Sequence, residues 1–487
     1  MNDIIIQEAN KSYIRVRCES GIAQELSEFF SFQIPGHKYM AKFKNGMWDG
    51  YIRLFNTRTH LLYSGLRQHV ETFAEEREYS LGYVEDFSDD NFSEHEAKTF
   101  FESLEVPDIE IRDYQLEAFI HGVRKRRAVM LCPTGSGKSL IAYLLTRYLN
   151  LPTLIIVPTI GLVGQMYQDF QDYGFDSDTY VHKLHGGQDK VSDKKIVIAT
   201  WQTVRNMPQK WLNQFRVVIG DEAHLFKAKE LTGIMEKMTL CPYRFGLTGT
   251  LDGLQVNKLV LEGLFGPVRT IARTIDLINA KYLSDLAIKC IIFRYPDEIR
   301  QVLSKTEYDI EKDYIITNAV RNKFIANLTL SLKGNTILFF TQVQKQGKIL
   351  HQMIHDKGKD RKIFYVDGGV SGDDRNDIRS IVEKESNAII VASTGTTSVG
   401  FNVRNIHNII FANPSKSRIR TLQSIGRGLR IKTDDIDKCT LFDLADDFSW
   451  ETKRSKKVNT TLKHFSERIK MYDSEEFNYT IYKVGLK

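Results

Sequence analysis

Cysteine is scarce in this chain, and the few cysteines present show no pairing pattern. The sequence of 487 residues contains five, an odd number, with no Cys-x-x-Cys pair among them. They stand at Cys18, Cys132, Cys241, Cys290 and Cys439. This set argues against a disulfide framework and against a structural zinc site, and it favours a reducing compartment such as the cytoplasm.

Long apolar runs and a leader pattern are also missing. The chain opens Met-Asn-Asp-Ile-Ile-Ile-Gln-Glu, without the basic start and apolar core of a signal peptide. No apolar run approaches the roughly 20 residues that span a bilayer. We therefore expect a cytoplasmic protein with no membrane partner. An apolar share of 42%, without short repeats or low-complexity tracts, predicts several ordinary globular cores.

The net charge of +6 is modest but unevenly placed. Between Glu71 and Glu105, twelve acids face only Arg77 and Lys98, so the first 105 residues carry a net −7 and the rest +13. A basic body fits a polyanionic partner such as nucleic acid. Many large cytosolic proteins carry a similar surplus, so charge alone does not decide the matter.

Short buried strands alternate with helices in two successive stretches of the chain. In the first stretch the expected strands are 128–132, 153–157, 196–199, 217–220 and 244–247, and in the second 336–340, 363–366, 388–391, 408–411 and 440–442. Apolar strands separated by helices predict parallel sheets covered on both faces. The fold class is therefore α/β. The expected segments are 1–105, a lobe at 106–285, a connection at 286–334, a second lobe at 335–450 and a basic extension at 451–487.

The first 105 residues predict a small α+β accessory domain that binds nucleic acid. Tyr39 to Tyr63 has the pattern of a β-meander, with Asn45-Gly46 as a tight hairpin turn and a helix at 66–79. Such a hairpin would project Lys42 and Lys44 from one face, with Lys38 nearby. Trp48 and Tyr51 could then contact DNA, although Trp48 is at least as well explained as a core residue.

The sharpest local signal is Cys132-Pro-Thr-Gly-Ser-Gly-Lys138-Ser139, between an apolar strand and an apolar-rich helix. Glycines let backbone N–H groups close around phosphate oxygens, and the following helix N-terminus adds partial positive charge. Lys138 would reach the β- and γ-phosphates of ATP, and Ser139 would bind Mg²⁺. The usual pattern begins with glycine where this chain has Cys132, but the strand–loop–helix context supports the assignment.

A second signal lies at Asp221-Glu222-Ala-His224, at the end of an apolar strand. Parallel sheets bind ligands at the carboxyl ends of their strands. Asp221 would hold Mg²⁺, and Glu222 would orient and deprotonate the attacking water; His224 suits a coupling role or simple packing. Phosphoryl transfer also needs positive charge on its transition state, and Arg427 and Arg430, three residues apart in Gln423–Arg430, are candidates.

In chain order, these segments resemble the superfamily-2 helicases over about 320 residues. Ile111–Gln115 looks like the adenine-reading segment, Cys132–Ser139 like motif I, Asp221–His224 like motif II and Gln423–Arg430 like motif VI. The other segments that resemble family motifs are Val157–Gln165, His185–Gly187, Ala199–Thr203, Leu247–Thr250, Ile337–Thr341 and Thr394–Asn402. Asn402 stands where an Asp is usual. The resemblance implies two tandem RecA-like lobes that close on ATP and bind nucleic acid on the opposite edge.

The resemblance also implies the two sets of contact residues. Those expected around ATP are Arg112, Gln115, Pro133, Thr134, Gly135, Ser136, Gly137, Lys138, Ser139, Gly400 and Asn402. Those expected against nucleic-acid phosphates, besides the three lysines above, are Thr159, Gly161, Gln165, Gly187, Thr200, Thr341 and Thr394. Phosphate contacts carry no sequence information, so the motor should be blind to sequence.

The Arg-Asp-Tyr-Gln segment, the Thr-Gly-Thr form and the basic body resemble double-stranded-DNA translocases and restriction-type motors more than DEAD-box RNA helicases. Asn45–Phe55 is similar to the tailed-phage helicases of the UvsW kind. That resemblance implies branch migration of Holliday junctions, fork regression and R-loop unwinding. The implied partners are branched or double-stranded DNA, an RNA–DNA hybrid, and single-strand-binding or recombination proteins.

Three other functions fit parts of this pattern. A P-loop kinase would not need the second lobe with Gln423–Arg430. A motor subunit of a nuclease complex would take its cleavage site from another chain, because no carboxylate–lysine cluster suggests one here. An RNA helicase differs only in substrate preference.

Overall fold

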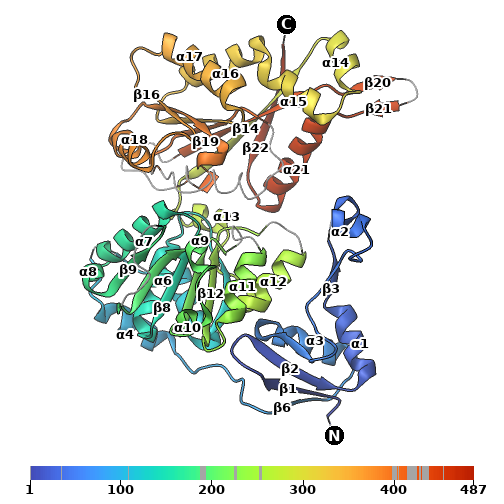
Figure 1. The fold of residues 1–487 in the computed structure, drawn as a ribbon. Helices are drawn as coiled ribbons and strands as arrows, with labels where there is room; N and C mark the ends of the chain where they lie inside the picture. Colours follow the sequence, from blue (N-terminus) through green and yellow to red (C-terminus); the bar gives the residue numbers. More distant parts are fainter. Residues whose placement is uncertain are drawn as a thin grey trace. The chain divides into compact units, whose positions relative to one another are not determined.

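The computed structural model describes residues 2–34, 36–107, 109–186, 193–223, 228–251, 255–397, 403, 405–413, 425–426, 429, 438–452 and 455–486. The chain forms two compact units (Figure 1). Unit 1 comprises Met1–Cys132 and Gly137–Ile271, and unit 2 comprises Pro133–Ser136 and Ala272–Lys487. Among the described residues, no helix is both long and apolar enough to cross a membrane.

Lobe 1, in unit 1, is built on a seven-stranded sheet with the order β13-β7-β12-β11-β8-β10-β9. Every neighbouring pair in it is parallel. The strands in that order are Val268–Thr270, Arg127–Leu131, Tyr243–Thr248, Val217–Asp221, Thr153–Val157, Ile196–Thr200 and Val181–Leu184. The longer helices are α5 (Asp113–Lys125), α6 (Lys138–Leu149), α7 (Ile160–Asp172), α11 (Ala228–Lys237) and α12 (Gln255–Phe265). The short ones are α8 (Ser177–Tyr180), α9 (Trp201–Val204) and α10 (Gln209–Leu212).

The central strands of lobe 1 are buried at every position, as β8 and β10 show. This explains why they appear in the sequence as continuous apolar runs. Leu154 and Val218 pack in one core with Ile234 and Met235 of α11 and Phe265 of α12. The phosphate-binding loop therefore begins at the end of a well-packed sheet.

Unit 2 contains a second seven-stranded parallel sheet, with the order β16-β17-β15-β18-β19-β14-β22. The strands in that order are Ile363–Val366, Ile389–Ser393, Thr336–Phe340, Asn408–Phe411, Lys438–Asp447, Asp285–Arg294 and Tyr479–Gly485. The expected pair of tandem parallel-sheet lobes is thus confirmed. Strands β14 and β22 come from the segments 286–334 and 451–487, which the sequence pattern had set outside the lobe.

The helices described in unit 2 are α13 (Thr274–Asn279), α14 (Asp297–Leu303), α15 (Tyr308–Thr317), α16 (Ala319–Ser331), α17 (Lys348–Lys357), α18 (Gly372–Lys384), α19 (Thr394–Thr397) and α21 (Thr460–Ser474). A π-helical turn covers Val343–Gly347. Strands β20 (Trp450–Thr452) and β21 (Ser455–Lys457) form a separate hairpin. The basic extension expected at the C-terminus contains α21. Its Arg468 is buried and bound to Asp443 of β19 at 2.8 Å, so that residue supports packing.

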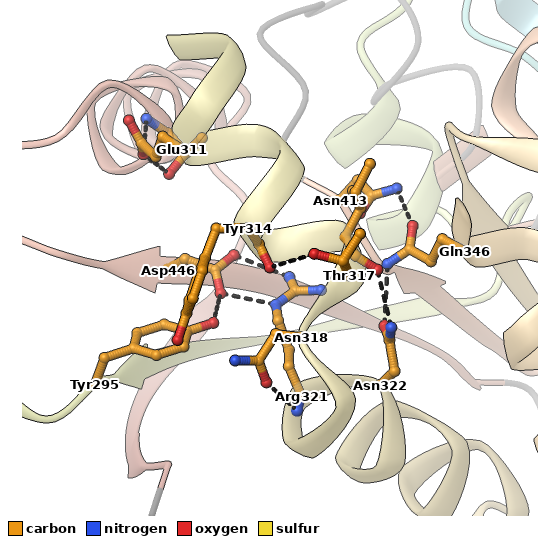
Figure 2. A network of polar contacts seen from close by, with 12 residues as sticks. Tyr295, Glu311, Tyr314, Thr317, Asn318, Arg321, Asn322, Gln346, Asn413 and Asp446 are labelled. Atoms are coloured by element: carbon orange, nitrogen blue, oxygen red, sulfur yellow. Dashed lines mark hydrogen bonds and ion pairs between the residues drawn. The ribbon is translucent and has the colours of Figure 1, made fainter. Parts of the chain in front are cut away.

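Buried polar pairs hold the helices of unit 2 to its sheet (Figure 2). Arg321 of α16, fully buried, donates two hydrogen bonds to Asp446 of β19, at 2.7 and 2.9 Å. The Tyr295 hydroxyl donates a third to the same carboxylate at 2.7 Å. A buried ion pair of this kind is costly to break from one side, so α16 and β19 form one body.

The N-terminal domain has a mixed sheet with the order β5-β2-β1-β6. Its strands in that order are Leu61–Tyr63, Tyr13–Cys18, Ile4–Glu8 and Leu81–Tyr83, and its helices are α1 (Ser20–Phe29) and α3 (Arg67–Glu76). The next helix, α4 (Glu94–Ser103), packs against lobe 1, where Phe100 contacts Phe119 of α5. Buried side chains alternate with more accessible ones along Ile4–Ile6 of β1 and along β2, so one face packs under α1 and α3. The expected small α+β domain is confirmed.

The meander expected over residues 39–63 is wrong. The hairpin strands are β3 (Ser31–Gln33) and β4 (Tyr51–Arg53), and the segment between them carries a 3₁₀ turn, η1 (His37–Tyr39), and a short helix, α2 (Ala41–Lys44). Gly46, at φ +67°, follows the end of α2, so Asn45-Gly46 terminates a helix instead of turning a hairpin. We call β3 and β4 the stalk and residues 36–50 the tip (Figure 1).

The N-terminal domain is docked on lobe 1 by a buried arginine. Arg244 of β12 is 1% exposed and donates to the Ser12 hydroxyl at 2.8 Å. Its other acceptors are the backbone carbonyls of Met235, Met238, Cys241 and Leu264. Gly65 lies so close to α12 that an added Cβ would be 1.9 Å from the Glu262 carbonyl oxygen. Only glycine allows this approach, so domain and lobe share one interface.

The acidic segment after the N-terminal domain has a structural role. Asp90 accepts two hydrogen bonds from Arg126, at 2.8 and 2.6 Å, and Asp89 pairs with Lys125 at 2.5 Å. The Arg126 guanidinium lowers the pKa of Asp90 below its ordinary range. The Phe92 carbonyl accepts from Arg124 at 2.7 Å. These acids bind the connecting segment to the end of α5.

Replacing Arg244 with methionine should destabilise unit 1 strongly. Methionine fills the space but cannot donate to any of the five acceptors, at a cost of at least about 3 kcal/mol. We expect the melting temperature to fall by at least about 5 °C, followed by circular dichroism. Arg205→Met is the control, since its side chain is 43% exposed and sits 3.8 Å from Glu230. Equal melting of both variants would contradict the docking role.

Candidate active site

The predicted phosphate-binding loop joins β7 to α6. Gly135 and Gly137 have φ of +86° and +79°, in the left-handed region that favours glycine. Lys138 is the first residue of α6, so the loop ends at a helix N-terminus, where anions bind well. The amide of Cys132 donates to the Thr248 carbonyl at 2.9 Å, which ties the loop to the Thr-Gly-Thr segment after β12.

Lys138 and Glu222, both predicted to act on ATP, lie together. The Lys138 Nζ is 3.2 Å from Glu222 Oε1 and 3.3 Å from the Cys132 carbonyl oxygen. Burial lowers the pKa of Lys138, but attraction from Glu222 and Asp221 outweighs it and leaves that pKa above its ordinary value. The ammonium group is therefore charged and directed at the position where phosphates would bind.

Asp221 ends β11 and is 8% exposed. Burial raises its pKa, repulsion from Glu222 adds to the shift, and Lys138 opposes it. Asp221 Oδ1 is buried without a hydrogen-bond partner among the described residues. Glu222 follows with φ of +49°; a non-glycine residue in that region costs free energy and often marks a functional site.

Two further residues lie beside the phosphate-binding loop, and the sequence predicted only one of them as a site residue. Gln115, in the predicted adenine-reading segment, is buried, and its amide nitrogen would be 2.4 Å from a Cβ placed on Gly137. This brings the two predicted segments together. Tyr173, at the end of α7, has its hydroxyl 2.8 Å from Ser139 Oγ. It belongs to no motif, so no pattern in the sequence pointed to it.

The residues predicted to contact nucleic acid in lobe 1 share one edge of the sheet. Strands β8 and β10 are neighbours with Val157 opposite Thr200, so both end at the same place. Thr159 precedes α7, and its hydroxyl is buried without a hydrogen-bond partner among the described residues. Gly161 and Gln165 follow on α7. The Gln202 side chain donates to the Pro158 carbonyl at 3.2 Å, which links the two segments.

The corresponding residues of unit 2 also meet at one edge. Thr341 follows β15, Thr394 follows β17, and Phe340 pairs with Ser393 in the register of these strands. The Asn413 amide donates to Thr341 Oγ1 at 2.9 Å and to Gln346 Oε1 at 2.6 Å, and Gln346 continues to Asn322 (Figure 2). This buried amide chain fixes the position of Thr341.

Some predicted site residues lie outside the described residues. They are Gly187, His224, Gly400, Asn402, Gln423, Arg427 and Arg430. The loop residues Pro133, Thr134 and Ser136 are described, and Ser136 is buried.

The three predicted DNA-binding lysines lie on the tip, but not as a hairpin face. Lys38 is in η1, and Lys42 and Lys44 are in α2. Two residues apart on a helix, the latter two point in different directions. All three are exposed. Trp48 is half-buried, and its Nε1 donates to the Tyr51 carbonyl at 2.7 Å, which favours the packing alternative for this residue.

Family models match the chain in three places. Residues 3–84 match "DNA helicase UvsW, N-terminal", residues 108–253 match "Type III restriction enzyme, res subunit", and residues 320–432 match "Helicase conserved C-terminal domain". A solved structure of phage T4 UvsW has a TM-score of 0.52 and 33% identity, covering 100% of both chains. A restriction-enzyme HsdR fragment from Vibrio vulnificus has a TM-score of 0.56 at 17% identity, covering 79% of this chain and 70% of its own, and so supports the fold alone.

Relatives with curated names agree. The chain is 35% identical to the ATP-dependent DNA helicase uvsW of Enterobacteria phage T4, over 99% of this chain and 100% of that protein. It is 29% identical to the DNA 3'-5' translocase XPB2 of Sulfurisphaera tokodaii, over 41% of this chain and 43% of that protein. Similarity along the whole length, together with the loop and carboxylates described above, shows that the chain belongs to the UvsW family of superfamily-2 helicases and is an ATP-dependent DNA helicase.

Proposed function

We propose that this helicase remodels branched DNA: it would migrate Holliday junctions, regress stalled forks and unwind R-loops, in the cytoplasm of a host cell. The observation that carries the proposal is the basic tip. Its lysines Lys38, Lys42 and Lys44 have no ion-pair partner within the described part of the chain, and the stalk extends them from a domain docked on the motor. Such charges suit phosphates beyond the path of a single duplex.

Lys138 would hold the phosphates of ATP. It lies 3.2 Å from Glu222, so the γ-phosphate would compete with that carboxylate for the ammonium group. Substrate binding would then release Glu222 to orient water and accept its proton. Gln115 and Arg112 would contact the base of ATP. Gly400 and Asn402 would contact other parts of the nucleotide. Arg427 and Arg430 would stabilise the charge of the transition state.

The residues present fit Mg²⁺. Asp221 offers a buried carboxylate oxygen without a hydrogen-bond partner among the described residues, and Ser139 offers a hydroxyl in the first turn of α6. Carboxylate and hydroxyl oxygens are ligands that Mg²⁺ prefers. When bound, the ion would neutralise charge on the phosphates.

ATPase stimulation tests the substrate. We expect a fork or four-way junction to stimulate turnover more than linear duplex DNA of equal length, and far more than duplex RNA. An RNA–DNA hybrid within a displaced strand tests the R-loop role. Stronger stimulation by duplex RNA would replace the proposal with an RNA helicase, and nicking of plasmid by the pure protein would replace it with a nuclease.

A triple Lys38/Lys42/Lys44→Ala variant should bind forks more weakly, because three phosphate contacts are lost. The slope of log affinity against log salt should become shallower by about 2–3, measured by fluorescence anisotropy. The control is Lys345/Lys362/Lys470→Ala, which removes equal charge from lysines already paired with Asp313, Glu385 and Glu467. An unchanged slope in the tip variant would contradict the assignment.

A further inference from the structure

The tip has a fixed shape although it has little core of its own. His37 is 7% exposed, its ring packs edge-on against Phe43 at 4.7 Å, and its Nδ1 lies 2.9 Å from the Ile34 carbonyl oxygen. Gly50, at φ +87°, lies against that ring so closely that an added Cβ would be 2.7 Å from His37 Cδ2. The amide of Met47 donates to the Lys42 carbonyl at 3.0 Å. The backbone of the tip is therefore held in place.

Two large apolar side chains stand out from this framework into solvent. Tyr39 is 83% exposed and Met47 is 77% exposed, and Met40, which follows Tyr39 in the chain, is 43% exposed. His37 takes the inward position of η1, which leaves Tyr39, two residues on, facing outward. The Tyr39 hydroxyl makes no hydrogen bond within the described residues. Exposed apolar groups rimmed by polar residues mark interaction sites.

The surroundings of these side chains indicate what they bind. Lys38, Lys42 and Lys44 lie within five positions of Tyr39 or Met47, and the acid of the tip, Asp49, is occupied by Arg53 at 2.5 Å. The exposed charges near Tyr39 and Met47 in the chain are thus mainly positive. A continuous duplex presents phosphates but keeps its base faces stacked. A branch point presents phosphates beside an exposed base face, which stacks on aromatic side chains and admits apolar wedges such as methionine.

We propose that Tyr39 and Met47 stack on the exposed base pair at a DNA branch point while the three lysines hold the phosphates of the separating arms. This inference rests on the proposed function and names the residues that distinguish a branch from a duplex. Lysines alone favour any duplex. Preference for a branch comes from the apolar pair, because only a branch offers it a base face.

The test compares Tyr39→Ala/Met47→Ala with the parent in the full-length protein. Affinities for a fork and for linear duplex of equal length are measured by anisotropy. A second fork carries 2-aminopurine at the branch, where its fluorescence reports stacking. We expect fork affinity to fall about tenfold, with a far smaller change for linear duplex, and the 2-aminopurine response to disappear. Tyr39→Phe/Met47→Leu should keep both signals.

The control is Tyr180→Ala/Leu240→Ala, which removes side chains 48% and 51% exposed from lobe 1 and should behave as the parent. Melting temperatures of all variants should agree, because the substituted residues are exposed. If the parent prefers forks and the tip variant keeps the same ratio, the inference fails and the proposed function stands. If the parent itself shows no preference for forks, both fail.

Discussion

Glu222→Gln should lower ATP turnover by about 10²–10⁴-fold while leaving ATP binding close to that of the parent. Glutamine keeps the size of the side chain, and its carbonyl oxygen can still accept from Lys138, which lies 3.2 Å from the carboxylate. It cannot take a proton from water. The Asp221 carboxylate, which would hold Mg²⁺, is unchanged. Steady-state ATPase assays with saturating fork DNA give the turnover, and a fluorescent nucleotide gives the affinity.

Glu230→Gln on α11 is the matched control, since it removes an equal charge from a carboxylate that is 3.8 Å from Arg205 and away from the loop. It should retain parental turnover. Loss of nucleotide binding in Glu222→Gln would instead assign Glu222 a structural role. Its left-handed backbone conformation is compatible with such a role.

Lys138→Ala should fail at both binding and turnover. The ammonium group is charged and directed toward the loop, so its loss removes a preorganised donor from the phosphates, worth about 10²–10³-fold in turnover, and weakens nucleotide affinity as well. Lys138→Arg should not restore activity, because the planar guanidinium is larger and less suited to this point contact. Nucleotide affinity therefore distinguishes the two active-site variants, because Glu222→Gln should retain it and Lys138→Ala should lose it.

Lys125→Ala is the control for this variant. That lysine is 35% exposed and pairs with Asp89, so its loss should leave ATPase activity at the parental level. Near-parental turnover in Lys138→Ala would show that another cation holds the phosphates.

Sequence predicted the buried strands well because burial on both faces makes them continuous apolar runs. The bounds of β8, β15, β16 and β18 agree with the prediction. The edge strands β9 and β22 were missed, because β9 has polar His182 and Lys183 at its centre and β22 is mostly exposed. The tip was misread because Asn-Gly serves equally as a hairpin turn and as a helix end, and tertiary contacts decide between them.

The site residues that lie in short sequence motifs could also be predicted from the sequence. Lys138 and Glu222 come from short segments whose chemistry is visible in the order of residues, and the structure places them in contact. Tyr173 and Arg244 could not be found in this way, because their partners are 34 and 232 positions away and no spacing rule links them. The exposure of Tyr39 and Met47 on the tip could not be predicted either, because it depends on His37 being placed inward in three dimensions.

The buried Arg244 makes the N-terminal domain a mechanical part of lobe 1. The strand that carries it, β12, continues to Thr248, which accepts from the loop that would hold ATP. A flexible hinge would let the N-terminal domain move relative to lobe 1. The buried Arg244 guanidinium, with its five hydrogen-bond acceptors, opposes such movement. We therefore expect the N-terminal domain to move together with lobe 1 at each advance along DNA, and the stalk that carries Tyr39 and Met47 to move with that domain.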